Sequence, residues 1–433
     1  MRAAPERIAA RERAADFAVL LVSPFPLLPP VHGGRVRTLG LARGLARAGA
    51  AVDVLAPWVP GTPRATLLEP GLRLHTHRML GNVLPVLFPK RVAPALALLS
   101  LQPRSPFGSR RWLSRFAGCD VMQFEFCGQF HWATLAPPST AVVYSAHNVE
   151  RDYHGADPEP QLLRAPALRR IEHLERVAVR SSDIVVTCSD ADIQRLTSLY
   201  GAPHESAVVA NGFDAEILAF RRAEMRDRAR AALGFAAADR VILFVGGDAA
   251  HNREAVRFLA HDVLPALGSA ARLLIVGRCG RAAPRGHPQI RHLGYVEDLR
   301  PSFAATDVAV NPVDFGSGTS IKLIEYVAAG LPTISTPIGL RGVPHLTGVV
   351  RSASRQLFAE ALMASPPEPS PDRGALAVWT WDALAQQLLD RYRQLRPRSG
   401  KASAATENRN GGILGRTRRA EQHPSWHGES CVK

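Results

Sequence analysis

Lysine and cysteine are both scarce in this chain of 433 residues. The few cysteines exclude some classes of site, and the few lysines make each one easier to interpret. The five cysteines are scattered, odd in number and never spaced as C-x-x-C. That pattern predicts neither a disulfide framework nor a zinc site, so we expect no metal and a reducing, cytoplasmic setting. Only four of the 53 basic residues are lysine, so a lysine within a motif is notable.

Long apolar runs are missing as well. The run from Phe17 to Leu28 contains prolines and follows several acidic residues, which favours a buried first strand and its loop over a signal peptide. The run from Gly81 to Leu101 is interrupted by Lys90, Arg91 and three prolines. No part of the chain therefore offers the roughly 20 clean apolar residues that a membrane-spanning helix needs.

The net charge of +15 suits an anionic partner such as nucleic acid, anionic lipid or a polyphosphate. No zinc finger or RNA-recognition signature is present, so we expect no nucleic-acid partner. Segment 78–115 mixes basic and apolar residues, and two interpretations stay open: binding to an anionic membrane surface, or an irregular insertion with a partly buried apolar side. Residues 1–16 and 397–433 are expected to be disordered tails, the second of them basic.

Short apolar runs alternate with helical patterns twice along the chain. In the first half, strands are expected at 17–22, 51–55, 120–124, 141–145 and 183–187, and helices at 34–48, 162–180 and 190–199. In the second half, strands are expected at 240–245, 272–276, 290–293, 308–311 and 333–336, and helices at 253–267, 320–329 and 380–395. Continuous apolar strands of this kind predict parallel sheets that are covered on both faces.

The sequence therefore predicts an α/β protein with two Rossmann-like, doubly wound parallel-sheet domains, at 17–212 and 213–378. Two such domains that face each other leave a central cleft lined by the carboxyl ends of their strands. Ligands of open α/β sheets bind at these strand ends. Motifs that follow strands are thus the first candidates for a site.

The segment from Gly316 to Tyr326 is a glycine-rich turn that leads into a helix carrying Lys322 and Glu325. Amides in the first turn of a helix, together with the positive end of its dipole, attract phosphate. The lysine adds a full charge, and the glutamate can accept hydrogen bonds from ribose hydroxyls. Taken alone, the pair is better explained as a surface pair at i, i+3, worth about 0.2–0.5 kcal/mol. The candidate amides belong to Ser317, Gly318, Thr319 and Ser320.

Two further loops carry glycines just after expected strands. Gly33 and Gly34 precede a helix, where paired glycines let backbone amides approach a phosphate or sugar closely. Gly247 and Arg253 follow the strand at 240–245 and could complete an anion site, because a diphosphate carries about two charges. A plain turn explains the first loop equally well, and a solvated arginine the second.

His147, Glu125, Tyr295 and Val296 also follow expected strands. The histidine could contact a transferred sugar, although a lone histidine is more often structural, and the glutamate has a similarly weak case. Tyr295 and Val296 could offer backbone groups to a base, although an ordinary loop is the more frequent explanation.

Two common nucleotide-binding motifs are absent from the sequence, and one apparent metal-binding motif has another explanation. Lys322 is followed by leucine and the glycine spacing is wrong, so the turn is not a P-loop. The Gly33-Gly34 turn is not a G-x-G-x-x-G fingerprint. Asp190-Ala191-Asp192 imitates a D-x-D metal motif, but Ser189 predicts a helix N-cap, and acidic residues are favoured in a first turn.

Together these features resemble the GT-B glycosyltransferases of the large retaining family 4. The resemblance rests on the doubled Rossmann pattern, the Gly33-Gly34 turn, His147, Asn211-Gly212-x-Asp214 and the segment 316–325, and it covers roughly 17–395. It implies a metal-independent hexosyltransferase without a cofactor. A nucleotide sugar would be the donor, and a glycan, a lipid-linked compound or a small molecule the acceptor. Cell-envelope or exopolysaccharide synthesis at the inner face of the cytoplasmic membrane is the implied setting.

The same resemblance assigns roles to residues. Glu325 matches the second glutamate of the family's E-x7-E pattern and would hold the donor ribose, whereas the first position is Ser317, as in a Gly-Ser-Gly-Thr subgroup. Trp381 would open a helix, 379–396, that crosses back to the first domain. The catalytic residues would be His147, Lys322 and Glu325, and the donor-binding residues Gly33, Gly34, Gly247, Arg253, Tyr295, Val296, Ser317, Gly318, Thr319 and Ser320.

Two other functions fit the same architecture. A UDP-sugar 2-epimerase would need additional cleft acids and bases, and product analysis without acceptor separates it from a transferase. A relative that binds nucleotide sugar without turnover is the non-enzymatic alternative, and Ser317 in place of glutamate is its best support.

Overall fold

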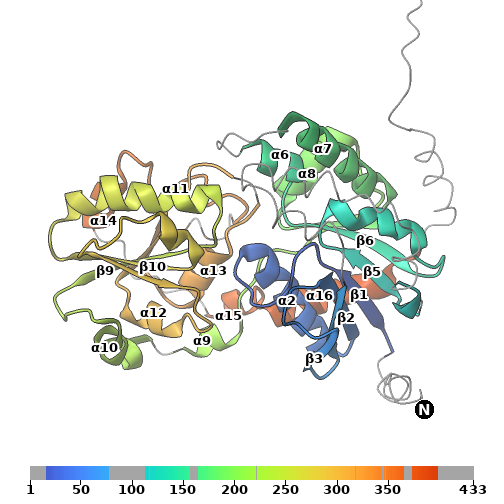
Figure 1. Cartoon of the computed structure of the whole chain (residues 1–433), viewed down its shortest axis with the longest axis horizontal. Coiled ribbons are helices and arrows are strands. Elements are labelled where there is room, and N and C mark those ends of the chain that lie inside the picture. The colour runs from blue at the N-terminus through green and yellow to red at the C-terminus, as the bar shows by residue number, and fades with distance from the viewer. Residues whose placement is uncertain are drawn as a thin grey trace, which may run out of the picture.

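The computed structural model describes residues 16–77, 113–116, 118–156, 164–220, 222–316, 318–343, 346, 348–364 and 373–397. Two α/β units lie side by side in it, each built on a sheet with helices on both faces (Figure 1). The predicted fold class is therefore confirmed. Both predicted tails and most of segment 78–115 lie outside the described residues, so their interpretations stay predictions. Within the described part of the chain, no helix is long and apolar enough to cross a membrane.

The first unit is an eight-stranded sheet with the order β3-β4-β2-β1-β5-β6-β7-β8. Its strands are β1 Ala18–Val22, β2 Ala51–Pro57, β3 Ala65–Glu69, β4 Leu72–His77, β5 Val121–Phe124, β6 Ala141–Ala146, β7 Ile184–Thr187 and β8 Ser206–Val208. All neighbours pair in parallel except β3 and β4, which form an antiparallel hairpin. Its helices include α2 Gly33–Arg47, the 3-10 helix η3 Cys127–Leu135, α6 Glu150–Gly155, α7 Arg164–Ser181 and α8 Asp190–Tyr200.

The second unit is a six-stranded parallel sheet with the order β11-β10-β9-β12-β13-β14. Its strands are β9 Arg240–Val245, β10 Ala271–Val276, β11 Ile290–Gly294, β12 Val308–Asn311, β13 Thr333–Ser335 and β14 Arg351–Ser352. Its helices are α9 Glu216–Ala219, α10 Arg222–Leu233, α11 Ala250–Phe258, α12 Arg300–Ala305, α13 Ile321–Ala328, α14 Phe358–Met363 and α15 Arg373–Ala377. The helix expected at 253–267 is only partly α-helical, because α11 continues as a π turn at Leu259–Val263 and a 3-10 turn at Leu264–Leu267.

Both faces of each sheet are buried, which explains the continuous apolar strands. In β1, Leu21 packs into the core beneath α2, whereas its neighbour Leu20 packs into the opposite core beside α7. In β9, Leu243 and Phe244 divide in the same way between two cores of the second unit. Each fully buried side chain of this size contributes about 1.5–3 kcal/mol relative to exposure.

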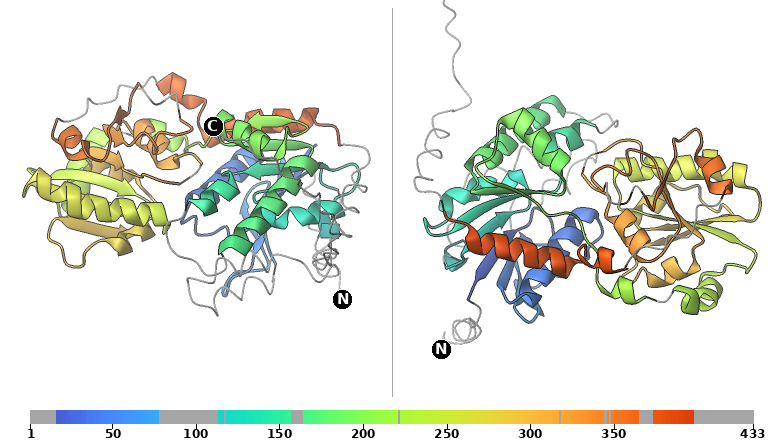
Figure 2. Two further views of the ribbon diagram at one scale, coloured as in Figure 1. Left: turned by 90° about the horizontal axis from the view of Figure 1, so that it is seen from above. Right: turned by 180° about the vertical axis from the view of Figure 1, so that it is seen from behind.

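The last described helix, α16 Trp381–Gln394, returns to the first unit after the chain has completed the second (Figure 2). It begins where the Thr380 hydroxyl accepts a hydrogen bond from the Ala383 amide, 3.3 Å away. It then packs against α2 at two glycines. A Cβ at Gly40 would lie 2.5 Å from the Trp381 ring, and one at Gly44 would lie 2.5 Å from the Ala385 Cβ. The two helices therefore touch closely enough to leave no room for side chains at these positions.

This packing predicts that Gly44→Ala destabilises the protein. The new Cβ would also meet the Trp381 carbonyl at 2.6 Å, and backbone cannot move aside cheaply, so overpacking should cost about 1–3 kcal/mol. Differential scanning calorimetry would measure the loss as a lower Tm. Gly155→Ala is the matched control, because a Cβ there has nothing within 4 Å. Equal Tm values for the two variants would contradict the close packing.

Candidate functional site

A cavity of about 540 Å³ lies between the two domains. Its wall includes loops that follow strands of both sheets: residues 30–33 after β1, Gly246 and Gly247 after β9, and Val313, Phe315 and Gly316 after β12. These loops leave the carboxyl ends of parallel strands, where open α/β sheets bind ligands. The cavity is also large enough for a small-molecule ligand.

The cavity brings together nine of the residues that the sequence predicts for the site. They are Gly33, Gly247, Tyr295, Val296, Gly318, Thr319, Ser320, Lys322 and Glu325. Gly34, His147 and Arg253 do not belong to its lining. Ser317 lies outside the described residues, so its role stays a prediction.

The glycine-rich loop before α13 is shaped by two left-handed glycines and by contacts with the first domain. Gly316 and Gly318 have φ angles of +125° and +77°, which side chains rarely adopt. A Cβ at Gly318 would lie 2.3 Å from the Asn148 Oδ1. The Asn211 side-chain amide donates to the Thr319 carbonyl at 3.2 Å and also to the Thr319 hydroxyl. The loop is thus docked on the first domain, while the first turn of α13 opens on the cavity.

Lys322 stands in the first turn of α13 and is held by contacts with the strand β9 and the helix α11. Its Nζ donates to Asn252 Oδ1 at 2.9 Å and lies 4.2 Å from the centre of the Phe244 ring. Burial lowers its pKa to about 8, although the nearby Cys279 and Glu325 act in the opposite direction. A cation with so little water around it gains much from an anionic ligand.

Glu325 lies one turn further along α13, and its carboxylate faces the same cavity. Burial raises its pKa to about 7, the nearby Asp214 raises it further, and Lys322 acts against both. Among the described residues, no group donates a hydrogen bond to this carboxylate. Its oxygens can therefore accept hydrogen bonds from hydroxyl groups of a bound ligand.

Two arginines near the glycine-rich loop have different surroundings. Arg253, which the sequence analysis proposed for an anion site, donates to Asp248 Oδ1 at 2.8 Å and lies outside the lining. Arg341 belongs to the lining, and its Nη2 donates to the carbonyls of Gly316 and Gly318 at 2.7 and 3.4 Å. No carboxylate in the described ranges forms an ion pair with it. Sequence reasoning missed Arg341, although its place in the loop after β13 was a usable signal.

Two histidines that the sequence analysis did not select also line the cavity. Burial lowers the pKa of His32 to about 4, and the charges of Arg35, His147 and Arg278 lower it as well. Burial likewise lowers the pKa of His251 to about 4, with help from Lys322. Both rings are therefore neutral at pH 7 and can offer one donor and one acceptor each.

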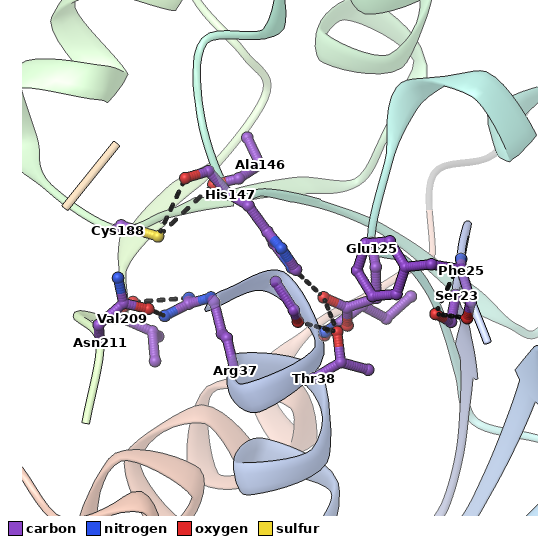
Figure 3. Close-up of polar contacts among 12 residues, drawn as sticks. Ser23, Phe25, Arg37, Thr38, Glu125, Ala146, His147, Cys188, Val209 and Asn211 are labelled. Atoms are coloured by element: carbon purple, nitrogen blue, oxygen red, sulfur yellow. Dashed lines mark hydrogen bonds and ion pairs between the residues drawn. The ribbon is translucent and has the colours of Figure 1, made fainter. Parts of the chain in front are cut away.

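His147 lies behind the cavity wall. Its Nε2 is 2.5 Å from Glu125 Oε2, and a Cβ at Gly34 would lie 3.3 Å from its Nδ1 (Figure 3). Its carbonyl would be 2.9 Å from a Cβ at Gly318. The residue thus stands where the first domain, the Gly33-Gly34 turn and the glycine-rich loop meet.

Metal ligation finds little support in the described part of the chain. No group of three or more His, Cys, Asp or Glu side chains is placed there to hold a metal ion. The Asp190-Ala191-Asp192 segment opens α8, where the Ser189 hydroxyl accepts a hydrogen bond from the Asp192 amide at 3.3 Å. The predicted N-cap is therefore confirmed.

Comparison with known proteins adds solved structures of the same architecture. Sucrose-phosphate synthase from Thermosynechococcus elongatus superimposes with a TM-score of 0.68 at 17% identity, covering 87% of this chain and 98% of that one. Anabaena HepE in complex with UDP and glucose gives 0.62 at 16% identity, covering 87% and 99%. A trehalose-6-phosphate protein from E. coli, bound with UDP-2-fluoro glucose, gives 0.60 at 13%, covering 88% and 100%. At these identities the likeness shows the fold, which is GT-B.

Sequence comparison identifies the family. D-inositol 3-phosphate glycosyltransferases of Mycobacterium bovis and Mycobacterium tuberculosis are 25% identical over 323 residues, which cover 66% of this chain. The match spans 63% of the length of these relatives. The profile described as Glycosyltransferase Family 4 matches residues 31–217, and the profile described as Glycosyl transferases group 1 matches residues 239–364. Because the two profiles account for both domains in order, the chain belongs to the family 4, or group 1, glycosyltransferases.

Proposed function

We propose that this protein transfers a sugar from a nucleotide diphosphate donor to an acceptor, with retention at the anomeric carbon. The observation that carries the proposal is the arrangement on α13. The first turn of this helix and Lys322 offer positive charge to a diphosphate, and Glu325, one turn away on the same cavity wall, offers a carboxylate to the ribose.

The proposed rate enhancement comes from positioning and from charge. The departing diphosphate gains negative charge in the transition state, and fixed donors in a site with little water stabilise it most. Lys322, the amides before α13 and the Arg341 guanidinium are placed to share this charge. The donor is a co-substrate in this scheme, and no cofactor or metal ion takes part.

UDP-sugars are the donors that the comparisons favour. Two of the similar structures hold UDP or a UDP-sugar. The mycobacterial relatives are named for inositol 3-phosphate, which supports a small phosphorylated acceptor beside the glycan and lipid-linked classes. A role in cell-envelope or exopolysaccharide synthesis, with segment 78–115 at the inner face of the membrane, belongs to the same proposal.

The proposal is tested by donor binding and donor consumption. A thermal-shift panel of UDP, GDP, ADP and their sugar forms should raise the Tm with one base, since a ligand that binds only the folded state stabilises it. The selected donor, labelled in its sugar, should then transfer the label to an extract-derived acceptor, with and without EDTA. Binding without any consumption would support the non-catalytic alternative, and a sugar changed at C2 in the absence of acceptor would support an epimerase. Loss of transfer in EDTA would contradict the metal-free scheme.

Glu325→Gln should weaken binding of the selected nucleoside diphosphate in a pH-dependent way. At pH 8 the wild-type carboxyl is ionised and bonds hydroxyls as a charged group, so the loss should be about tenfold or more. Because burial raises its pKa to about 7, this advantage is present above that value and fades as pH falls towards 6. Isothermal titration calorimetry at both pH values measures it, with Glu360→Gln on the exposed side of α14 as the control. An equal loss of nucleotide affinity at both pH values, or a large fall in Tm, would indicate that Glu325 has a structural role instead.

Arg341→Ala should weaken nucleotide binding, whereas Arg253→Ala should leave it within about twofold. Arg341 lines the cavity without a carboxylate partner among the described residues, but Arg253 is already paired with Asp248. We expect about a tenfold loss of UDP affinity for Arg341→Ala, typical of a charge-assisted hydrogen bond, and little change for uridine. A loss of UDP affinity greater than twofold in Arg253→Ala would indicate that Arg253 contacts the phosphates. If Arg341→Ala lost affinity for UDP and uridine equally, Arg341 would only maintain the shape of the glycine-rich loop and would not contact the phosphates.

A further inference from the structure

A buried chain of polar side chains lies directly behind His147, and the proposed transfer does not yet use it. At its centre is Glu125, which follows β5 and whose side chain is wholly buried. Two donors bond its carboxylate at close range, His147 Nε2 at 2.5 Å and the Gln123 side-chain amide, and the Thr38 hydroxyl lies at 3.4 Å. Figure 3 shows the glutamate between α2 and the histidine. Burying a carboxylate without such partners costs free energy. The hydrogen bonds to Glu125 offset this cost.

The surroundings of Glu125 favour its ionised form. Burial by itself raises its pKa, but the bonds from His147 and Gln123 and the nearby charge of Arg37 outweigh burial, so the pKa lies below its usual value. Arg37 is itself 1% exposed. Its guanidinium donates to the carbonyls of Val209 and Ala210 at 2.7 and 2.8 Å, and to the Asn211 Oδ1 at 3.0 Å. None of these partners is charged, and the buried carboxylates whose ionised form this cation favours are Glu125 and Asp192.

The hydrogen bonds also have a fixed direction. An ionised carboxylate only accepts, so the proton between Glu125 and His147 must sit on the histidine Nε2. Gln123 agrees with this direction, because its NH₂ group donates to Glu125 while its Oε1 accepts from the Tyr392 hydroxyl. Tyr392 belongs to α16, the helix that crosses back from the second domain. The chain therefore runs from α16 through the sheet to the ring of His147.

The other ring nitrogen of His147 faces the turn that leads into α2. With Nε2 turned to Glu125, Nδ1 lies beside Gly34, one residue from Gly33 in the cavity wall. In the described part of the chain, the groups around Glu125 and its partners include the Thr38 hydroxyl on α2, the Cys188 thiol after β7 and the His32 ring. Burial raises the pKa of Cys188 to about 11 and lowers that of His32 to about 4, so both groups are neutral at pH 7.

We propose that Glu125 is a positioning residue for the transfer step. It holds a proton on His147 Nε2 and the ring in one orientation, so that Nδ1 stays against the Gly33-Gly34 turn of the cavity wall and the His147 carbonyl against the glycine-rich loop. Arg37 keeps Glu125 ionised, and Gln123 and Tyr392 keep the carboxylate from rotating. This inference rests on the proposed function for its effect on the transfer step. The tautomer itself does not depend on that function.

Glu125→Gln tests the role with nearly the same shape and no charge. We expect kcat to fall about 10- to 100-fold, by analogy with the loss of a hydrogen-bond partner that orients a metal-ligating histidine. The Kd for UDP should stay within about twofold, because the diphosphate and ribose sites lie on the second domain. Nitrogen NMR of histidine-labelled protein, assigned by comparison with His147→Ala, should show one Nε2–H tautomer in the wild type and its loss in the variant. An unchanged tautomer with kcat within twofold would overturn the proposal.

Two further variants separate positioning from general stability. Glu175→Gln is the matched control, because Glu175 is also a fully buried carboxylate of the first domain and bonds the Tyr200 hydroxyl and the Glu150 amide at 2.8 and 2.7 Å. It should keep kcat within about twofold and leave the His147 spectrum unchanged. A kcat loss equal to that of Glu125→Gln would overturn the proposal.

Tyr392→Phe keeps the test decisive if Glu125→Gln fails to fold. It removes only the hydroxyl that orients Gln123, and kcat should fall several-fold with UDP affinity retained, whereas an unchanged kcat and His147 spectrum would contradict the chain. If the wild type neither binds a nucleotide nor consumes a donor, the proposed function fails. The NMR comparison would still decide whether Glu125 sets the tautomer of His147.

Discussion

The close packing of α16 against α2 is the constraint on which the cleft depends. The chain leaves the first domain after β8, builds the second, and returns at Thr380, which pairs with Phe213 of the outgoing segment. The Phe213 carbonyl accepts from the Trp381 amide at 3.0 Å. Glycines at 40 and 44 let Trp381 and Ala385 lie directly on α2. Because α2 begins at Gly33 in the cavity wall, a helix held along its length by α16 also holds that wall in place. Tyr392, on the same helix, donates a hydrogen bond to Gln123 in β5 and so connects α16 to the side chains behind His147.

The cavity separates its charges along α13. Lys322 and Arg341 lie at the glycine-rich end, and Glu325 and Asp214 lie further along the same wall. Burial weakens the charged form of both ionisable groups on the helix, so the pKa of Lys322 falls to about 8 and that of Glu325 rises to about 7. A bound ligand of matching polarity would favour the charged form of each group. A nucleoside diphosphate has that polarity, with anionic phosphates next to a neutral ribose rich in hydroxyls.

Much of the fold could be predicted because its strands are buried on both faces. The strand at 240–245, for example, is apolar from Val241 onwards, and the structure has it with the same bounds. The β3–β4 hairpin was missed because it is antiparallel and partly exposed at the sheet edge, so it lacks the continuous apolar signal. In the site, α13 could be located from the glycines and Lys322. The approach of Arg341 to the loop joins positions 25 residues apart, which spacing along the chain does not reveal. Arg253 pairs with Asp248, which is five residues before it, and this local pair depends on the side-chain conformations that the loop imposes.

A crystal structure of the complex with the preferred nucleoside diphosphate would test the central claim most directly. The account predicts that the diphosphate lies at the start of α13 within ion-pair distance of Lys322 Nζ, and that the ribose hydroxyls donate to the Glu325 carboxylate. The Asn252 contact of Lys322 should then be shared with or replaced by phosphate oxygen. A nucleotide bound elsewhere on the second domain, or in the cleft with its phosphates turned away from α13, would contradict it.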